Sequence, residues 1–373
     1  MDSDSERLSP FFTFHTVVAV LQHLSASRAL IGGELRGPTT VVWEHGVIIE
    51  VRDVTSDERV FDGILSPGFI DTQVNGVGHD RIVDESCDWT RLSHALRSQG
   101  VTTWLPTVPT QHPDFYVNGL APLHQKVTQS LPGLPQALGL HLEGPLLGAK
   151  PGAHRSEWFV ADENRVEEWQ SARMVTVAPE HPFAQSVVGM LSSAGVVVSI
   201  GHTAASREAY DDAVNAGARH ATHVFNAMSG IDHVHGGIAA YVLTDDRVTF
   251  SVIADLVHVH PSAIHVAWRA AGERMIVVSD QVALENVKNQ STTARLFGAS
   301  VGIDAALKNL VEACGIPLAE ALVMVSERPA RVLRLTDRGF LRVGLRADLV
   351  LLTEDLSVHT VVCDGFPTSV VAN

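Results

Sequence analysis

Several side chains that could bind a metal or move a proton stand directly after short apolar runs. Glu143 is the most informative, because it stands, with His141, directly after the apolar run 137–140 and precedes a Gly144-Pro145 turn. A carboxylate at the end of a buried strand is costly unless something pairs with it, and a metal ion is one such partner. The alternative is a glutamate exposed at a loop tip, and this motif alone leaves both interpretations open.

The same arrangement recurs along the middle of the chain. The residues that end successive apolar runs are Gln73 and Asn75, Thr107, Glu143, Glu180, His202, His223, Asp255 with His258, and Asp280. Polar residues are common where a chain leaves the core, but two histidines, a glutamate and an aspartate after four separate runs are less so. If these runs are neighbouring strands, the pattern favours a metal-dependent hydrolase.

The elements that must position these residues alternate between strand and helix. The expected strands are 68–71, 101–105, 138–141, 174–177, 196–200, 221–224, 248–253 and 275–279. Helical patterns separate most of them, for example 207–216 and 261–271, each followed by a glycine that is typical of a helix end. This alternation predicts an α/β fold, a (β/α)8 TIM-like barrel, in which catalytic residues lie at the carboxyl ends of the strands.

The two ends of the chain have sequence patterns typical of short β-strands instead. Residues 40–43 and 47–51 predict a hairpin, and the segments 339–344, 347–352 and 360–362 predict further strands. We therefore expect a small β-sandwich domain built from both termini, 29–65 plus 336–373, beside a catalytic barrel of 66–335. Residues 1–28 are expected to form an N-terminal extension with one amphipathic helix over 10–25.

Composition narrows the class of partner and the compartment. The 373 residues carry a net charge of −15, which argues against nucleic acid or an anionic membrane as partner. The three cysteines are widely spaced, and the acidic N-terminus does not resemble a signal peptide, so a cytoplasmic protein is expected. The apolar run 17–21 is too short to span a bilayer.

Taken together, the motifs resemble the N-acetylglucosamine-6-phosphate deacetylase family of the amidohydrolase superfamily. The resemblance covers about 29–365, with the motifs in the family's order. The motifs that carry it are 66–76, 141–145, 201–203, 222–228, 278–280 and the closing segment 344–350. Each alone is a weak signal, whereas the set is highly specific.

The resemblance implies a site with one divalent metal held by Glu143, His202 and His223. Zn²⁺ is the expected ion, with Fe²⁺ or Mn²⁺ as alternatives. Many superfamily members have His-x-His on the first strand, which supports a second metal, but here Gln73 and Asn75 take those positions. Gln73 is therefore expected to orient the metal-bound water and Asn75 to contact the substrate; the alternative for Gln73 is an ordinary loop amide.

The same resemblance assigns the proton transfer and the sugar contacts. Asp280 matches the catalytic aspartate, and His258 matches a histidine that meets the substrate and stabilises the oxyanion. His154 matches the histidine that meets the sugar, with a solvated loop residue as the alternative. The backbone amides of Asn226 and Ala227 are expected to help hold the substrate.

Three departures from the family pattern concern substrate recognition. Leu256 stands where the family has a glycine, and the segment after Asp280 is short. Val234 stands where the family has an arginine that a partner subunit contributes to the substrate phosphate, with His233 and His235 beside it. Because valine cannot bind phosphate, we expect weaker selection for the 6-phosphate, unless another basic residue such as Arg207, Lys288 or Arg295 replaces it.

The sequence therefore predicts a homodimeric metal-dependent deacetylase of an N-acetylated amino sugar, with N-acetylglucosamine 6-phosphate as the expected substrate. Two alternatives stay open. One is an amidohydrolase of the same mechanism that acts on a different N-acyl sugar or amide. The other is a non-catalytic relative that binds a sugar phosphate.

Overall fold

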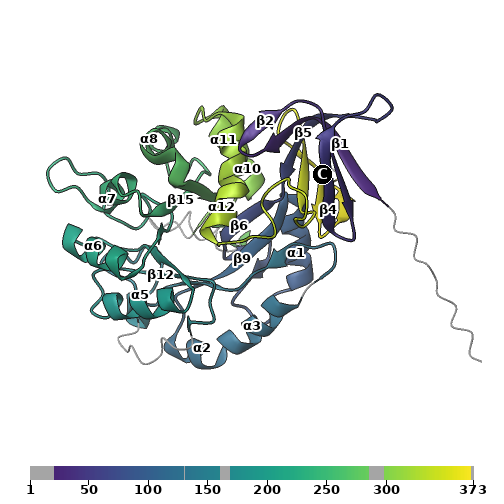
Figure 1. Cartoon of the computed structure of the whole chain (residues 1–373). Helices are drawn as coiled ribbons and strands as arrows, with labels where there is room; N and C mark the ends of the chain where they lie inside the picture. The colour runs from purple at the N-terminus through teal and green to yellow at the C-terminus, as the bar shows by residue number, and fades with distance from the viewer. Residues whose placement is uncertain (1–20, 130, 160–168, 285–297, 371–373) are drawn as a thin grey trace, which may run out of the picture.

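The computed structural model describes residues 21–129, 131–159, 169–284 and 298–370, and most of them form a barrel of parallel strands (Figure 1). The strands are hydrogen-bonded in the order β10-β9-β11-β12-β13-β14-β15-β16, with β6 on the other side of β9. Their bounds are β6 Phe69–Val74, β9 Val101–Pro109, β10 Gln136–Ala137, β11 His141–Glu143, β12 Met174–Val177, β13 Val197–Ile200, β14 His220–Ala221, β15 Thr249–Ile253 and β16 Met275–Val278. The predicted (β/α)8 barrel is confirmed.

The first and last barrel strands meet just beyond their carboxyl ends. Val74 forms an isolated parallel bridge with Gln281, and the N–H of Asp280 donates to the carbonyl of Gln73 at 3.0 Å. The buried Asp71 carboxylate adds to this seam by accepting the backbone N–H groups of Gln73 and Ser279. The seam therefore brings the first-strand motif next to Asp280.

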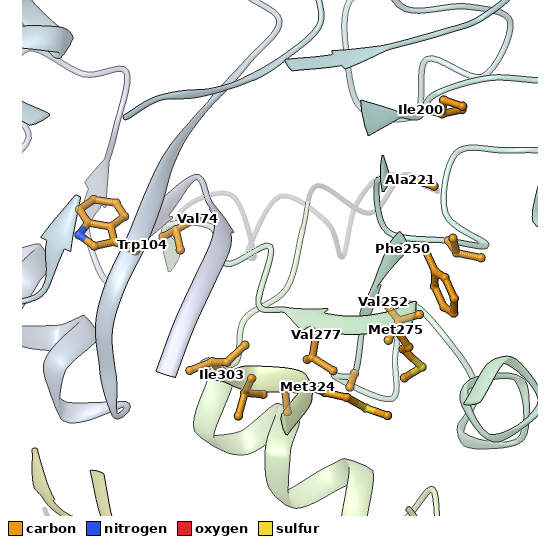
Figure 2. Close-up of a cluster of buried hydrophobic side chains, with 14 of the residues drawn as sticks. Val74, Trp104, Ile200, Ala221, Phe250, Val252, Met275, Val277, Ile303 and Met324 are labelled. Carbon is orange, nitrogen blue, oxygen red and sulfur yellow. The ribbon is translucent and has the colours of Figure 1, made fainter. Parts of the chain in front are cut away.

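Helices cover the outside of the barrel and bury the outward faces of its strands. Figure 2 shows Val277 of β16 next to Ile303 and Met324, which belong to the helices α10 and α11. The helices are α1 Trp89–Ser98, α2 Pro113–Asn118, α3 Leu120–Thr128, α5 Ala184–Ser193, α6 Arg207–Ala216, α7 Ile238–Thr244, α8 Pro261–Ala271, α10 Ile303–Glu312, α11 Leu318–Val325 and α12 Glu327–Val332, with 3₁₀ turns η1 Ser156–Trp158 and η3 Gly272–Arg274. Among the described residues, no helix is long and apolar enough to cross a bilayer.

Strands from both chain ends form a second sheet, in the order β19-β18-β17-β5-β1-β3-β4, with β2 on β1 (Figure 1). Their bounds are β1 Gln22–Ile31, β2 Glu34–Arg36, β3 Thr39–Glu44, β4 Val47–Asp53, β5 Phe61–Pro67, β17 Leu349–Thr353, β18 Val358–Cys363 and β19 Phe366–Ser369. Nε1 of Trp43 on β3 donates to the carbonyl of Gly365, which lies between β18 and β19. This contact brings two distant parts of the sheet together over a shared hydrophobic core. The small β domain built from both termini is confirmed, whereas its exact boundaries stay a prediction.

Two local predictions at the chain ends are wrong. Residues 22–25, expected as the end of a helix, belong to strand β1, because pairing with β3 and β5 overrides the local helical pattern. Strand β1 therefore begins at Gln22, and the rest of the predicted helix lies outside the described residues. The segment 339–344 forms turns instead of a strand, since Gly339 and Gly344 both adopt φ of 87°.

Candidate active site and metal centre

The carboxyl ends of the barrel strands surround a cavity of about 540 Å³. Nearly all the residues that the sequence placed in a site line it. They are Asn75, Glu143, His154, His202, His223, Asn226, Ala227, His258 and Asp280. They come from segments that are up to 205 residues apart, as the hydrogen bond between Asn75 and Asp280 illustrates. The closed barrel is what brings them together.

Glu143, the last residue of β11, stands at the centre of the polar cluster. Its Oε1 lies 3.1 Å from Nε2 of His202 and 2.9 Å from Nε2 of His223. Its Oε2 lies 3.6 Å from Nε2 of His154. The carboxylate is buried, so the interpretation of an exposed loop-tip glutamate is excluded.

For His202 and His154, the partner of Nδ1 shows which tautomer the neutral ring adopts. Nδ1 of His202 lies 3.2 Å from the carbonyl oxygens of Lys150 and Pro151, which can only accept, so Nδ1 carries the hydrogen and Nε2 is left with a lone pair. His154 is the opposite case, because its Nδ1 accepts the backbone N–H of Thr110 at 3.1 Å. The Nε2 of a neutral His154 therefore carries a hydrogen and is suited to donate rather than to bind a metal.

The donor set fits a divalent metal. Burial, aided by the nearby His154, lowers the pKa of His202 to about 4, so its imidazole is neutral at pH 7. Burial alone would raise the pKa of Glu143, but the surrounding imidazoles of His154, His202 and His223 hold it well below the usual range. A lone pair of His202 and an ionised carboxylate then face each other, and a cation between them satisfies both.

Two partly overlapping groups of side chains could supply the ligands. The ligand atoms of Glu143, His154 and His202 lie within 4.8 Å of one another. The set expected from sequence has His223 in place of His154, and His223 also points its Nε2 at Glu143. The hydrogen on Nε2 of a neutral His154 disfavours ligation by this histidine.

Gln73 lies behind the carboxylate rather than in the cavity lining. Its Nε2 donates to Oε1 of Glu143 at 2.9 Å. It is almost completely buried, so it is not a solvated loop amide. The predicted contact with a metal-bound water stays a prediction, whereas the observed contact fixes the orientation of the Glu143 carboxylate.

Asp280 lines the cavity from the seam between β16 and β6. Burial raises its pKa well above the usual range, and the nearby Glu143 adds to this. Its Oδ1 accepts a hydrogen bond of 2.8 Å from Asn75 Nδ2, which holds the carboxylate in place. A carboxylate with a raised pKa is a stronger base than an ordinary one and is therefore a suitable proton acceptor.

His258 enters the cavity from the loop after β15. Its Nδ1 lies 2.7 Å from Oδ2 of Asp255, and its buried Nε2 has no hydrogen-bond partner among the described residues. The same carboxylate accepts the backbone N–H groups of Val257 and His258. The Nδ1 edge of the imidazole is thereby fixed, and Nε2 is the ring nitrogen left to meet a substrate.

Three site residues that follow barrel strands adopt the left-handed backbone region, with φ of 51° at His202, 33° at His223 and 49° at Asp280. Such a conformation costs about 1–3 kcal/mol for a residue other than glycine. It ends the strand ladder at each position and turns the side chain into the cavity. Leu256 shares it with φ of 64°, so the residue that replaces the family glycine is held in a conformation that glycine would adopt without strain.

Other residues singled out in the sequence support the cavity or lie elsewhere. Glu180 accepts the N–H groups of Ala149 and Ala204 and so joins the loops after β11 and β13. Thr107 accepts the N–H of Val74 within the barrel. Val234 is 68% exposed, and its loop borders a second pocket that includes Arg207 and His235. Lys288 and Arg295 lie outside the described residues.

The sequence placed Asp255 at a strand end without a role, and it did not single out Thr110, Arg81, Arg155 or Trp158. Thr110 orients His154, Asp255 orients His258, and Arg81, Arg155 and Trp158 line the cavity. Arg155 directly follows His154, so its position was open to prediction. Thr110, Arg81 and Trp158 have no local signal, because long-range loop packing alone brings them to the cavity.

Comparisons with known proteins agree with this geometry. The model of the amidohydrolase family matches residues 64–366. Human N-acetylglucosamine-6-phosphate deacetylase is 31% identical, with 90% of this chain and 89% of the relative covered. N-acetylgalactosamine-6-phosphate deacetylase of Escherichia coli O157:H7 is 32% identical, with 86% and 92% covered.

Solved structures give the same result. One is a variant of N-acetyl-D-glucosamine-6-phosphate deacetylase from Mycobacterium smegmatis in complex with N-acetyl-D-glucosamine-6-phosphate. It has a TM-score of 0.85 and 27% identity, with 94% of this chain and all of that chain covered. The N-acetylglucosamine-6-phosphate deacetylase of Thermotoga maritima has a TM-score of 0.82 and 26% identity, with 93% and 99% covered.

Proposed function

This chain belongs to the amidohydrolase family, in the group of its N-acetylglucosamine-6-phosphate deacetylases, and from this premise we propose that it hydrolyses the acetamide of an N-acetylated amino-sugar phosphate. The products are acetate and the free amine. The observation that carries the proposal is the buried Glu143 with its imidazoles in the same cavity as Asp280. A ligand set and a separate proton acceptor are the two parts that amide hydrolysis by water requires.

The residues of the chain divide the reaction between them. Glu143, His202 and His223 would hold a divalent metal, which would supply Lewis-acid chemistry by lowering the pKa of a water and polarising the amide carbonyl. Asp280 accepts the proton of the attacking water and returns it to the amine nitrogen as the C–N bond breaks. Nε2 of His258 is positioned to meet the substrate, because Asp255 occupies Nδ1.

Further features of the proposal are finer than the family assignment. We propose one metal ion per chain, Zn²⁺ with Fe²⁺ or Mn²⁺ as alternatives, and a homodimer in the cytoplasm. His154 would donate to the sugar from Nε2, and the backbone amides of Asn226 and Ala227 would help hold it. Metal analysis of purified protein and its mass in solution test the first two statements.

The substrate experiment measures acetate release from N-acetylglucosamine 6-phosphate, its galactosamine epimer and both sugars without phosphate. We expect the highest kcat/KM for N-acetylglucosamine 6-phosphate. The 32% identity to an N-acetylgalactosamine-6-phosphate deacetylase makes N-acetylgalactosamine 6-phosphate the second candidate. Turnover of a different N-acyl amide in preference to all four would replace the proposed substrate, and tight binding of the phosphates without acetate release would indicate a non-catalytic binding protein.

A further inference from the structure

The cavity contains two permanent cations that neither the metal centre nor the proton transfer uses. Among the described residues that line it, Arg81 and Arg155 are the arginines, and no lysine lines it. Both guanidinium groups stay charged at every working pH. In a protein with a net charge of −15, two arginines in the lining of the active cavity create a local site for an anion.

Arg155 is arranged to bind an oxyanion. Its guanidinium lies over the ring of Trp158, with 4.7 Å between Cζ and the ring centroid. It forms no ion pair with any carboxylate among the described residues. A guanidinium stacked on an aromatic ring keeps its N–H donors free along the edge of its plane, which is the geometry that binds phosphate through two hydrogen bonds.

Arg81 is a weaker but available second donor. It ends the short strand β8 Asp80–Arg81, and its Nη1 lies 3.6 Å from Oδ1 of Asp84, with both side chains 40% exposed. So long and solvated an ion pair contributes little stability and can be exchanged for a ligand. The neighbouring Asp80 does not compete, because Arg91 pairs with its carboxylate at 2.7 Å.

The other candidate phosphate donors are placed less well. Arg207 lines the second pocket and pairs with Asp211 at 2.8 Å. His235 is in the same pocket and contacts Asp232. Among the described residues, the exposed loop with Val234 therefore supplies no cation to the active cavity. The arginines that line this cavity are Arg81 and Arg155.

We propose that Arg155, backed by Trp158 and assisted by Arg81, binds the phosphate of the substrate within the same chain, in place of an arginine from a partner subunit. The proposal rests on the proposed deacetylase function and names the group that selects its phosphorylated substrate. It also reverses an expectation from the sequence. The preference for the phosphorylated sugar is retained, and it does not change between pH 6 and 8, because arginine does not titrate there.

The test compares kcat/KM for N-acetylglucosamine with and without the 6-phosphate in the parent and in Arg155→Gln, Arg81→Gln and the double variant. Arg155→Gln should lower kcat/KM for the phosphorylated sugar by about 10- to 100-fold, the range typical of hydrogen bonds to a charged group. It should change kcat/KM for the unphosphorylated sugar far less. Arg155→Lys should recover part of the loss, since an ammonium keeps the charge without the two-pronged geometry.

Two further variants make the result decisive. Arg36→Gln removes a cation from the β domain and serves as the matched control, and Arg207→Gln tests the second pocket. A phosphate preference that survives in the Arg155 and Arg81 double variant, or that is lost in Arg207→Gln, would overturn the proposal. If the parent releases acetate from neither sugar, the proposed function fails instead, so the two failures are distinguishable.

Discussion

Nδ1 of His258 lies 2.7 Å from Oδ2 of Asp255, three residues earlier in the same loop. Burial alone would raise the pKa of Asp255, but the side chain and backbone N–H of His258 lower it, so the carboxylate is ionised at neutral pH. The carboxylate also accepts two backbone N–H groups. This contact therefore fixes both the loop and the tautomer of the imidazole.

If Asp255 acts by positioning His258, Asp255→Asn should lower kcat/KM by roughly 10- to 100-fold, as is typical when a partner that orients a site histidine is removed. The effect should be strongly non-additive with His258→Ala, because both changes disable the same imidazole. A double-mutant cycle measures this. Additive losses would mean that Asp255 acts independently of His258.

The second prediction concerns Asp280. Asp280→Asn keeps the volume of the side chain but cannot accept a proton, so kcat should fall by about 10²–10⁴-fold. Metal content and melting temperature should stay near those of the parent, because the substitution is close to isosteric and the new amide oxygen can still accept the hydrogen bond from Asn75. Asn75→Ala is the companion variant, expected to keep the metal and lose less activity. A kcat for Asp280→Asn close to that of the parent would remove Asp280 from the mechanism.

The strand ends explain how much of this site could be predicted. Glu143, His202 and Asp280 were predictable, because a polar residue directly after a buried strand must lie at the carboxyl edge of the barrel. Asp255 and Thr110 were not assigned roles, since their function depends on which loop folds back onto which histidine. The start of β1 at Gln22 was missed because strand pairing with β3 is a long-range effect that the local pattern does not contain.

The third prediction separates the two possible ligand sets. His223→Ala and His202→Ala should lose the bound metal, whereas His154→Ala should keep it and lose activity through weaker substrate binding. The reason is that Thr110 occupies Nδ1 of His154 and leaves the hydrogen on Nε2. Metal content per chain, measured before and after dialysis against a chelator, checks this. Loss of metal in His154→Ala with retention in His223→Ala would assign the ligands to Glu143, His154 and His202.

The last prediction concerns Asp71, which ties β6 to the segment that carries Asp280. Burial raises its pKa to about 6, although backbone N–H groups of Gln73 and Ser279 act in the opposite direction. A folded-state pKa above the unfolded value means that the folded protein binds the proton more tightly. The stability contributed by this proton is fully present below pH ~4 and is lost as the pH rises through 6.

Asp71→Asn should remove this dependence, because an amide does not titrate. The free energy of unfolding of the parent relative to the variant should therefore fall between pH 4.5 and 7, by up to about 3 kcal/mol for a pKa difference of about two units. Denaturant unfolding of both proteins at equal metal load measures it. Asp304→Asn is the comparison variant, since burial also raises the pKa of Asp304 but its helix α10 lies outside the seam. If the free energies of unfolding of the parent and Asp71→Asn differ by the same amount at pH 4.5 and at pH 7, Asp71 is ionised over this whole range. The seam would then be stabilised by a charged carboxylate.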